Sequence, residues 1–254
     1  ARVVRPFVLR RTKGEVLQEL PPKTEMQIDV ELNGEERKIY EEARLAAIAE
    51  LKQLGPDLGQ ATRFHVLAAL TRLRQLASDG GTVGAPTKLL RLADLAEPLI
   101  EEGHHVLVFS QFVKLLDRAE AVLRARSIPS ARLDGSTPAE DRAPIVDRFQ
   151  AGPPSVLLVS LKAGGTGLNL TAADHVVLLD PWWNPAVEDQ AADRAHRIGQ
   201  TRPVTVIRLV SRETVEEAML ALHQAKRELG AKLFSEGTGA EALSPGELFE
   251  LLGR

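Results

Sequence analysis

The chain has 254 residues, 44% hydrophobic and 26% charged, so it is long enough for one large domain or one domain with an appendage. It has no cysteine, and its six histidines lack the spacing of paired ligands beside a carboxylate, so we predict no structural metal. The formal net charge of -3 confines any DNA contact to a local basic patch and predicts weak DNA binding by this chain alone. Without a long apolar run or a secretory signal, we expect a soluble cytoplasmic protein with no membrane partner, associated with the nucleoid if its source is bacterial.

The first part of the chain divides into a connector and a helical region. Residues 1–32 combine a basic cluster with a proline pair and show no sustained hydrophobic period, which is typical of a connector. Asn33, with Glu36 three residues later, predicts the start of a helix that extends to about Leu54. A second helix is predicted over residues 60–77, because leucines recur there at spacings of three. The two helices are expected to pack as a pair.

From residue 87 onward, short unbroken apolar runs alternate with helical patterns. Runs of this kind are typical of strands that helices cover on both faces, so we predict an α/β fold with an open parallel sheet. The predicted strands are Val106–Phe109, Val156–Val159, Val176–Leu179 and Val204–Ile207.

Capping residues predict where the helices of this region begin. Thr137–Glu140 and Thr214–Glu217 have the pattern of a capping box, and Asn184-Pro185 combines an N-cap with proline at the first helical position. A last long helix is predicted over residues 213–230, and a short one near Ser244-Pro245.

Ligands of open parallel sheets bind beyond the carboxyl ends of the strands, where this chain has polar or glycine-rich loops. The loop Ser160–Asn169 contains glycines that let backbone N–H groups approach an anion, and the alternative is a tight turn between strand and helix. The chain contains no Gly-Lys-Ser/Thr and no Asp-Glu pair after an apolar run, so a self-sufficient ATPase is not expected.

Two arginines and two tryptophans are further candidates for the site. Arg194 and Arg197 are predicted to lie on one face of a helix, where they could converge on one phosphate. The alternative is that they form ion pairs with Glu188, Asp189 or Asp193. Trp182 and Trp183 lie in a loop between prolines, and they either pack on a neighbouring loop or stack on a base or sugar. His196 is expected to be structural.

Several segments together, in this order and spacing, resemble the C-terminal lobe of the Swi/Snf family of superfamily 2 helicases. The segments Pro6–Lys13 and Leu20–Lys23 are similar to the family's link out of the first lobe, so the resemblance covers nearly the whole chain. The run from Asp193 to Gln200 is the most specific motif. The motifs that carry the resemblance are Leu107–Phe112, Leu133–Thr137, Ser160–Asn169, Trp183–Pro185 and Gln190–Gln200.

The resemblance implies a RecA-like lobe with a small helical insertion and a C-terminal helical brace. It divides the chain into an inter-lobe linker (1–32), a helical protrusion (33–82), the RecA-like lobe (83–212) and the brace (213–254). It implies that Arg194 and Arg197 are arginine fingers for ATP, which, with Mg²⁺, is held mainly by an N-terminal RecA-like lobe. The implied nucleotide-binding residues are Gly165, Gly167, Asn169 and Gln190. The implied contacts to double-stranded DNA are Ser110, Gln111, Ser136, Thr137, Ser160, Lys162 and Trp183.

The implied function is the C-terminal motor lobe of a DNA-dependent ATPase that translocates on duplex DNA and acts on DNA or a DNA-bound protein. Two departures from the family pattern are evident: Leu73–Asp79 replaces a Cys-x-His-Pro stretch, and no Walker A segment is present. The alternatives are an RNA helicase lobe, against which the run from Asp193 to Gln200 argues, and a non-enzymatic DNA-binding or partner-docking module.

Overall fold

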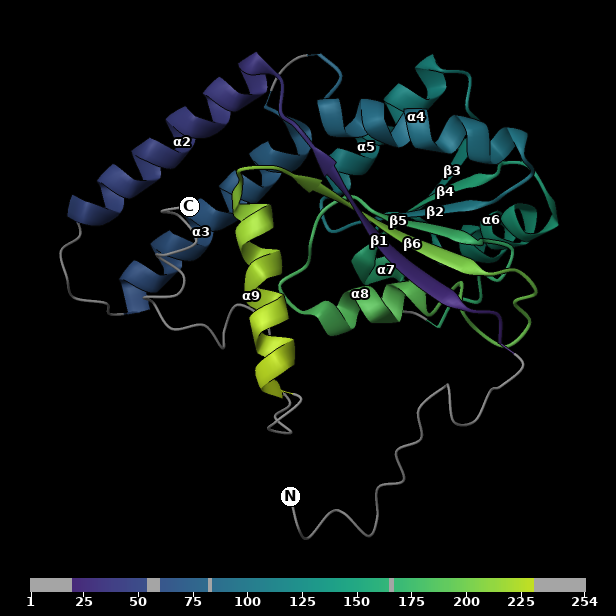
Figure 1. The fold of residues 1–254 in the computed structure, drawn as a ribbon. Coiled ribbons are helices and arrows are strands. Elements are labelled where there is room, and N and C mark those ends of the chain that lie inside the picture. The colour runs from purple at the N-terminus through teal and green to yellow at the C-terminus, as the bar shows by residue number, and fades with distance from the viewer. Residues whose placement is uncertain (1–19, 54–59, 82–83, 165–166, 231–254) are drawn as a thin grey trace, which may run out of the picture.

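The computed structural model describes residues 20–53, 60–81, 84–164 and 167–230. Its centre is a six-stranded sheet in the order β1-β6-β5-β2-β4-β3, and every strand pair is parallel (Figure 1). This confirms the predicted open parallel α/β sheet. The strands are β1 Lys23–Val30, β2 Val106–Ser110, β3 Ser130–Leu133, β4 Val156–Ser160, β5 His175–Leu178 and β6 Val204–Ser211.

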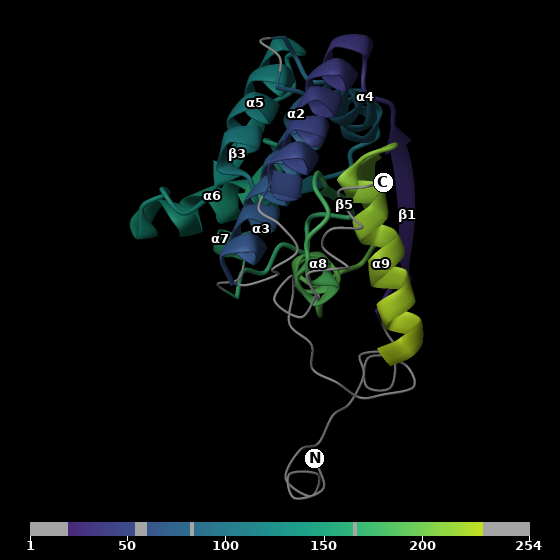
Figure 2. The same ribbon diagram turned by 90° about the vertical axis from the view of Figure 1, so that its left-hand side faces the viewer.

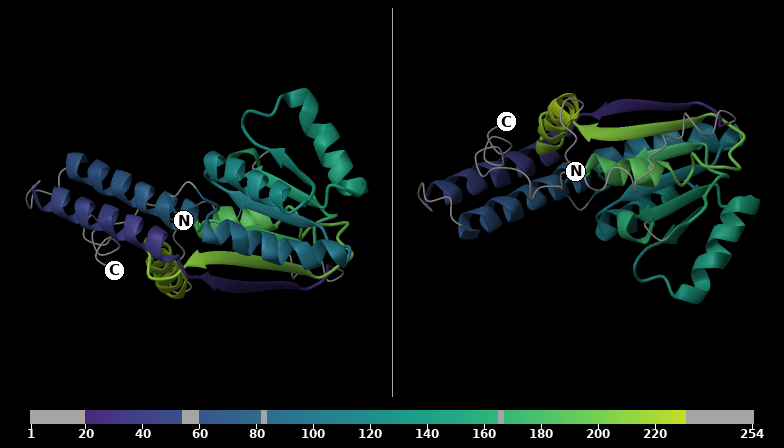
Figure 3. Two further views of the ribbon diagram at one scale, coloured as in Figure 1. Left: turned by 90° about the horizontal axis from the view of Figure 1, so that it is seen from above. Right: turned by 90° about the horizontal axis from the view of Figure 1, so that it is seen from below.

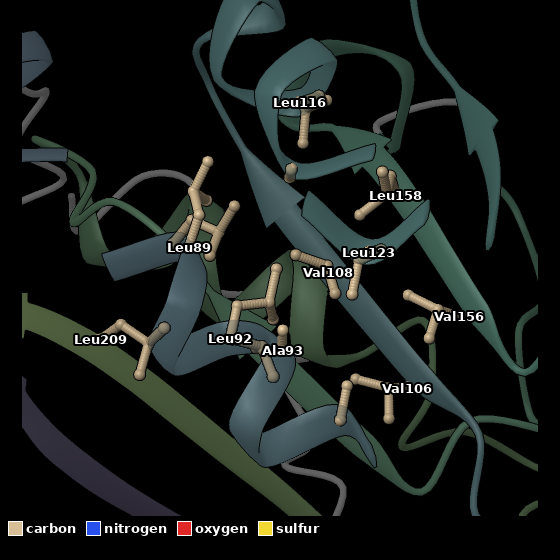
Figure 4. Packing of buried hydrophobic residues seen from close by; sticks show 14 of the residues in the cluster. Leu89, Leu92, Ala93, Val106, Val108, Leu116, Leu123, Val156, Leu158 and Leu209 are labelled. Carbon is tan, nitrogen blue, oxygen red and sulfur yellow. The ribbon is translucent and has the colours of Figure 1, made fainter. Parts of the chain in front are cut away.

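Helices cover both faces of the sheet, which explains why the central strands are apolar without alternation. All five residues of β2 and of β4 are buried. One face is covered by α4 Thr87–Glu101 and α5 Val113–Ala125, whose leucines pack on alternate residues of β2 and β4 (Figure 4). The other face is covered by α6 Ala139–Ala151, α7 Leu161–Gly164 and α8 Pro185–Ala192. Burial of each large apolar side chain contributes about 1.5–3 kcal/mol.

The two edge strands differ from the prediction. Residues 23–30, assigned to a connector from sequence, form β1, which pairs with β6 along its whole length. The connector interpretation is therefore wrong for these residues. Most of β1 is exposed, so its sequence mixes charged with apolar residues and lacks the buried pattern. At the opposite edge, only Leu133 of β3 is buried, and this strand was not predicted either.

A pair of helices projects from one end of the sheet, formed by α2 Gly34–Gln53 and α3 Gln60–Asp79 (Figures 1 and 3). The predicted capping box at its start is confirmed: Asn33 Oδ1 accepts a hydrogen bond from Glu36 N at 3.0 Å, and Glu36 Oε2 accepts one from Asn33 N at 3.0 Å. Glu36 also accepts from Thr87 N at 2.8 Å, which ties the pair to the start of α4.

The helix α9, Val215–Gly230, packs against α3 at the base of this pair (Figure 2). A third apolar cluster joins them, with Tyr40 and Leu70 from the pair and Val215 and Met219 from α9. Tyr40 Oη also accepts a hydrogen bond from Val215 N at 2.8 Å. The C-terminal helix thus braces the projecting pair.

The other predicted helix starts have mixed outcomes. Asn184 caps α8 by accepting from Ala186 N at 3.0 Å, as predicted. The box at 137–140 is wrong, because the N-cap is Pro138 and Thr137 Oγ1 instead accepts from Asp134 N. The capping box predicted at 214–217 forms with shifted partners: Thr214 Oγ1 accepts from Glu216 N at 3.2 Å, and Glu217 Oε2 accepts from Glu213 N.

Three predicted features lie outside the described residues: the segment Pro6–Lys13, the short helix near Ser244-Pro245 and Gly165 of the glycine loop. No helix in the part of the chain that the structure describes is long and apolar enough to cross a membrane.

Candidate nucleotide and DNA site

The loops after β2 and β5 meet at the carboxyl edge of the sheet through Asp180. Ser110 Oγ donates to Asp180 Oδ1 at 2.5 Å, and Gln111 N donates to Asp180 Oδ2 at 3.3 Å. Asp180 is buried, and burial raises its pKa to about 6 against the opposing effects of Arg74 and Ser110. The buried Ser110 therefore shapes the loop around Asp180, and its predicted contact with DNA stays a prediction.

Ser160 and Lys162, after β4, differ in their exposure. Ser160 is buried, and its Oγ accepts a hydrogen bond from Ala163 N at 3.3 Å, so its side chain starts the short helix α7. Lys162 is exposed, so its charge is available to a phosphate. Of these two residues, Lys162 is the one with an exposed side chain, and both DNA contacts stay predictions.

Ser136 and Thr137 lie in the turn that follows β3. Ser136 donates to Asp134 Oδ1 from both its N (2.7 Å) and its Oγ (2.6 Å), and it is exposed. Burial of Asp134 opposes its ionisation, but the hydrogen bonds from Ser136 and Arg132 outweigh this and hold the pKa of Asp134 below its usual range. The carboxylate thus fixes a turn that presents Ser136 to solvent.

Arg194 and Arg197 do not lie on a helix, which corrects the prediction. The helix α8 ends at Ala192, and tighter hydrogen bonds follow, from Arg194 N to Ala191 O (3.1 Å) and from Ala195 N to Ala192 O (3.1 Å). Arg197 is exposed, whereas Arg194 is only 8% exposed. The two arginines therefore share a turn but not a helix face.

The side chain of Gln200 holds this arginine turn in place. Its Nε2 donates to the carbonyl oxygens of Thr171 (3.1 Å), Ala173 (2.8 Å) and Ala195 (3.1 Å). Because Leu170 N also donates to Arg194 O at 3.0 Å, the end of the glycine loop and the arginine turn form one unit. Gln200 was recognised as the end of the Asp193–Gln200 motif but not for this role, because the residues on both sides of it in the sequence are exposed and give no local signal.

The predicted nucleotide-binding residues of the described chain are open to solvent. Gly167, Asn169 and Gln190 are exposed, and Gly167 has a φ of +72° with free space where a side chain would begin. Gly167 and Asn169 belong to the segment that leads into Leu170 and so to the arginine turn. The structure thus connects these two residues to Arg194, while Gln190 precedes it on α8.

Arg194 is a buried cation with an unsatisfied donor. Within the described residues, its Nε has no hydrogen-bond partner, and neither Arg194 nor Arg197 takes part in an ion pair there. Of the acidic neighbours considered from sequence, Glu188 is engaged by Arg208 Nε at 2.8 Å and by Trp182 N at 2.8 Å. The alternative of an ion pair with Glu188 is therefore wrong.

Trp182 and Trp183 are both partly buried, and each packs on the protein. Trp182 lies against the apolar cluster under α8, and Trp183 against the cluster at the base of the projecting helices. The Arg74 guanidinium lies 5.2 Å from the Trp183 ring centroid. The packing alternative thus describes both side chains, and contact of Trp183 with a duplex stays a prediction.

At the amino edge of the sheet, the fold brings together histidines that are distant in sequence. Asp174 Oδ2 lies 2.7 Å from His104 Nδ1, and Asp174 Oδ1 lies 2.9 Å from His175 Nδ1. Arg202 Nη1 is 3.1 Å from the same carboxylate, and these partners outweigh burial to hold the pKa of Asp174 well below its usual range. Asp174 thus forms an ion pair with Arg202, and the ligand atoms of His104, Asp174 and His175 all lie within 4.8 Å of one another, so these three side chains could hold a metal ion. Sequence spacing did not predict this cluster.

The fold and the arginine turn define a helicase-type RecA-like lobe. The family model "Helicase conserved C-terminal domain" matches residues 87–199, and the model "SNF2-related domain" matches residues 1–81. The chain is 38% identical, over 97% of its length, to an uncharacterized ATP-dependent helicase of Mycoplasma pneumoniae, of which it covers 24%. It therefore belongs to the Swi/Snf-type family of helicase-like proteins.

Solved structures agree in fold. The C-terminal domain of the Sulfolobus solfataricus SWI2/SNF2 ATPase superposes with a TM-score of 0.72 at 26% identity, covering 90% of this chain and 97% of that one. The core of the same ATPase in complex with dsDNA has a TM-score of 0.75 at 30% identity, covering 98% of this chain and 55% of that one. The chain spans about a quarter of the length of the curated relatives it matches, since the covered share is 24% in the first three.

Proposed function

We propose that this chain is the C-terminal motor lobe of a DNA-dependent ATPase that translocates on double-stranded DNA. The observation that carries the proposal is the buried Arg194, whose Nε has no partner among the described residues, in a turn bonded to the glycine loop. A buried donor is costly while it lacks a partner, and a nucleotide phosphate is the anion that arginine forks bind best. Arg74 also has a buried Nε without a partner among the described residues, but of the two arginines it is Arg194 that lies in the turn bonded to the glycine loop. The family membership supports ATP as the ligand of Arg194.

In this proposal, the nucleotide lies between two lobes. This chain has no Gly-Lys-Ser/Thr, so ATP and Mg²⁺ would be held mainly by an N-terminal RecA-like lobe. Gly167, Asn169 and Gln190 would approach the nucleotide from this side, with Gly165 as a further candidate outside the described residues. The open, side-chain-free space at Gly167 fits the close approach of a phosphate.

The arginine turn would act during phosphoryl transfer. Arg194 and Arg197 would hold the charge that spreads over the phosphate oxygens in the transition state. Gln200 fixes the backbone of this turn, so the guanidinium of Arg194 is oriented before the nucleotide arrives. Such preorganisation lowers the barrier without tightening binding of the ground state.

The DNA contacts would come from the loops at the carboxyl edge and after β3. Ser136, Thr137 and Lys162 have side chains that are exposed or partly exposed, whereas Gln111 is partly exposed but has a buried Nε2. The buried Ser110 and Ser160 would shape their loops instead of binding phosphate. The dsDNA complex of the related Sulfolobus ATPase supports a duplex as the partner, and a DNA-bound protein in the cytoplasm or nucleoid would be a further target. Contacts of this kind grip the backbone without reading sequence.

The test is an ATPase assay on the full-length gene product that carries this chain, with and without duplex DNA or single-stranded RNA. We expect stimulation by duplex DNA and no measurable turnover by residues 1–254 alone. DNA-stimulated hydrolysis by the 254-residue chain, abolished by a point change within it, would contradict the assignment to one lobe. DNA binding without any turnover by the full-length product would favour a non-enzymatic module, and stimulation by RNA alone an RNA helicase.

A further inference from the structure

Arg74 of α3 is a buried cation that makes its polar contacts outside its own helix. It is 1% exposed, and its Nη1 donates to Gln111 Oε1 at 3.3 Å while its Nη2 donates to the carbonyl oxygen of Pro181. Gln111 belongs to the loop after β2 and Pro181 to the loop after β5. One guanidinium from the projecting helices thus spans both loops of the carboxyl edge.

Two aromatic rings, one from each loop, lie beside this guanidinium. The Arg74 guanidinium carbon is 5.5 Å from the Phe112 ring centroid and 5.2 Å from the Trp183 ring centroid. Both distances are within the range of cation–π contacts. Arg74 therefore contacts each loop both through a hydrogen bond and through an aromatic ring.

The charge of Arg74 is balanced by Asp180, with Nη2 and Oδ2 4.0 Å apart. Burial lowers the pKa of Arg74, and Asp180 acts against this. Well-packed apolar residues often stabilise a fold as much as a buried ion pair does. Stability alone therefore does not account for this ion pair. The two-pronged guanidinium of Arg74 also contacts two loops that are far apart in the sequence, and so it can set their geometry.

We propose that Arg74 is a positioning residue through which the projecting helices fix the loops 110–112 and 181–183 for duplex DNA. The inference rests on the proposed function, because Gln111 and Trp183 are DNA contacts only within it. Without the fork, each loop keeps its strand but loses its common anchor, so binding of the duplex weakens.

Lys88 provides a matched control at the same junction. It is also 1% exposed, and its Nζ lies 2.5 Å from Glu216 Oε2, with no contact to either loop. Arg74→Met and Lys88→Met each remove one buried cation and keep an unbranched apolar side chain. Should Lys88→Met not fold, Ser78→Ala replaces it, since it removes only the 2.7 Å bond to Glu216 Oε1.

The first experiment tests positioning in the 254-residue chain and does not depend on DNA. The chain has two tryptophans, so the change Trp182→Phe leaves Trp183 as the one tryptophan whose fluorescence is observed. We expect Arg74→Met to shift its emission to the red and to raise acrylamide quenching about twofold, because the ring loses its cation and packing. Lys88→Met should change neither quantity. Unchanged quenching in folded Arg74→Met would overturn the proposal.

The second experiment measures DNA-stimulated ATPase activity of the full-length gene product. Arg74→Met should raise the DNA concentration for half-maximal stimulation about tenfold, with turnover at saturating DNA within about twofold, because loop positioning acts on binding. Arg74→Lys keeps the positive charge but not the two-pronged guanidinium, so it should also raise the DNA concentration for half-maximal stimulation. This variant tests positioning by Arg74 even if Arg74→Met does not fold.

The outcomes separate this inference from the proposed function. If duplex DNA stimulates the wild type but Arg74→Met and Arg74→Lys retain its half-maximal concentration, positioning by Arg74 is wrong. If duplex DNA does not stimulate the wild type, the proposed function falls, and Trp183 quenching alone decides whether Arg74 holds the loop.

Discussion

Two buried cations of this molecule have opposite surroundings. Lys88, at the junction of α4 and α9, faces Glu216, whose carboxylate also accepts from Ser78 Oγ at 2.7 Å and from Ser211 N at 2.9 Å. Arg194, in the turn after α8, has an Nε without a partner in the described chain. The first cation is satisfied by the fold itself, and the second is not.

The difference indicates what each region is for. A satisfied buried ion pair joins elements and stabilises them only as long as both partners remain. An unsatisfied buried donor costs free energy in the isolated lobe, and that cost is recovered when the phosphoryl group in the transition state meets the donor. Lys88 should therefore affect stability and Arg194 turnover, and the following changes test this contrast.

The largest effect is expected at Arg194. In the full-length gene product, Arg194→Ala should still bind ATP and DNA but hydrolyse ATP at least about a hundredfold more slowly, because arginine fingers act in the transition state. Lysine should not rescue turnover, since a point charge lacks the planar fork. Turnover, nucleotide affinity and Tm are measured on one preparation, with exposed Arg126→Ala as the control. Near-normal turnover per folded molecule would exclude the arginine-finger role.

Lys88→Met should lower the free energy of unfolding by about 3 kcal/mol, because it leaves the Glu216 carboxylate buried without its cation. Urea titration of the 254-residue chain measures the loss. The double change Lys88→Met/Glu216→Gln should recover part of it. If Lys88→Met instead slows turnover per folded molecule as Arg194→Ala does, the contrast between the two cations fails.

A smaller effect is expected at Lys162, the exposed lysine of α7. Lys162→Ala in the full-length product should weaken duplex binding alike for unrelated sequences and lower the slope of log K against log salt by about one. Lys52→Ala, an exposed lysine at the end of α2, is the control. A loss of binding confined to one DNA sequence would point to base readout.

The smallest effect is expected at Glu25 of β1. Burial opposes its ionisation, but hydrogen bonds from Lys23 and Arg208 outweigh it and lower its pKa from 4.5 to about 2. Since the folded pKa is lowered, its stabilisation is present above pH 4.5 and is lost as the pH falls towards 2. Glu25→Gln should lower the free energy of unfolding above pH 4.5 by about 1 kcal/mol, after allowance for solvent screening, and so make it less dependent on pH. Urea titrations at several pH values test it, and a Glu25→Gln profile identical to that of the wild type would contradict it.

The sequence predicted the parts of the fold where burial is uniform. The strands β2 and β4 are apolar on both faces, and their runs were located to within a residue. The edge strands β1 and β3 were missed because solvent on one side permits polar residues, and hydrogen bonds to a distant strand, not a local pattern, define them.

The candidate site was predictable as a set of segments but not in its geometry. Arg194 and Arg197 were identified, yet the helix expected to carry them ends earlier, because a local period does not reveal where carbonyl groups find other donors. Arg74 was missed, since an arginine in a leucine-rich helix looks like a surface residue. Its partners Gln111 and Pro181 lie 37 and 107 residues away, beyond any pattern of spacing.

The pairing of β1 with β6 has a mechanical consequence. Eight residues of β1 lie parallel to eight of β6, from Lys23 opposite Val204 to Val30 opposite Ser211. A force applied to β1 along its axis loads its hydrogen bonds to β6 together, in shear, instead of opening them one after another. Because β6 also pairs with β5, a pull on β1 is passed through β6 to the rest of the sheet.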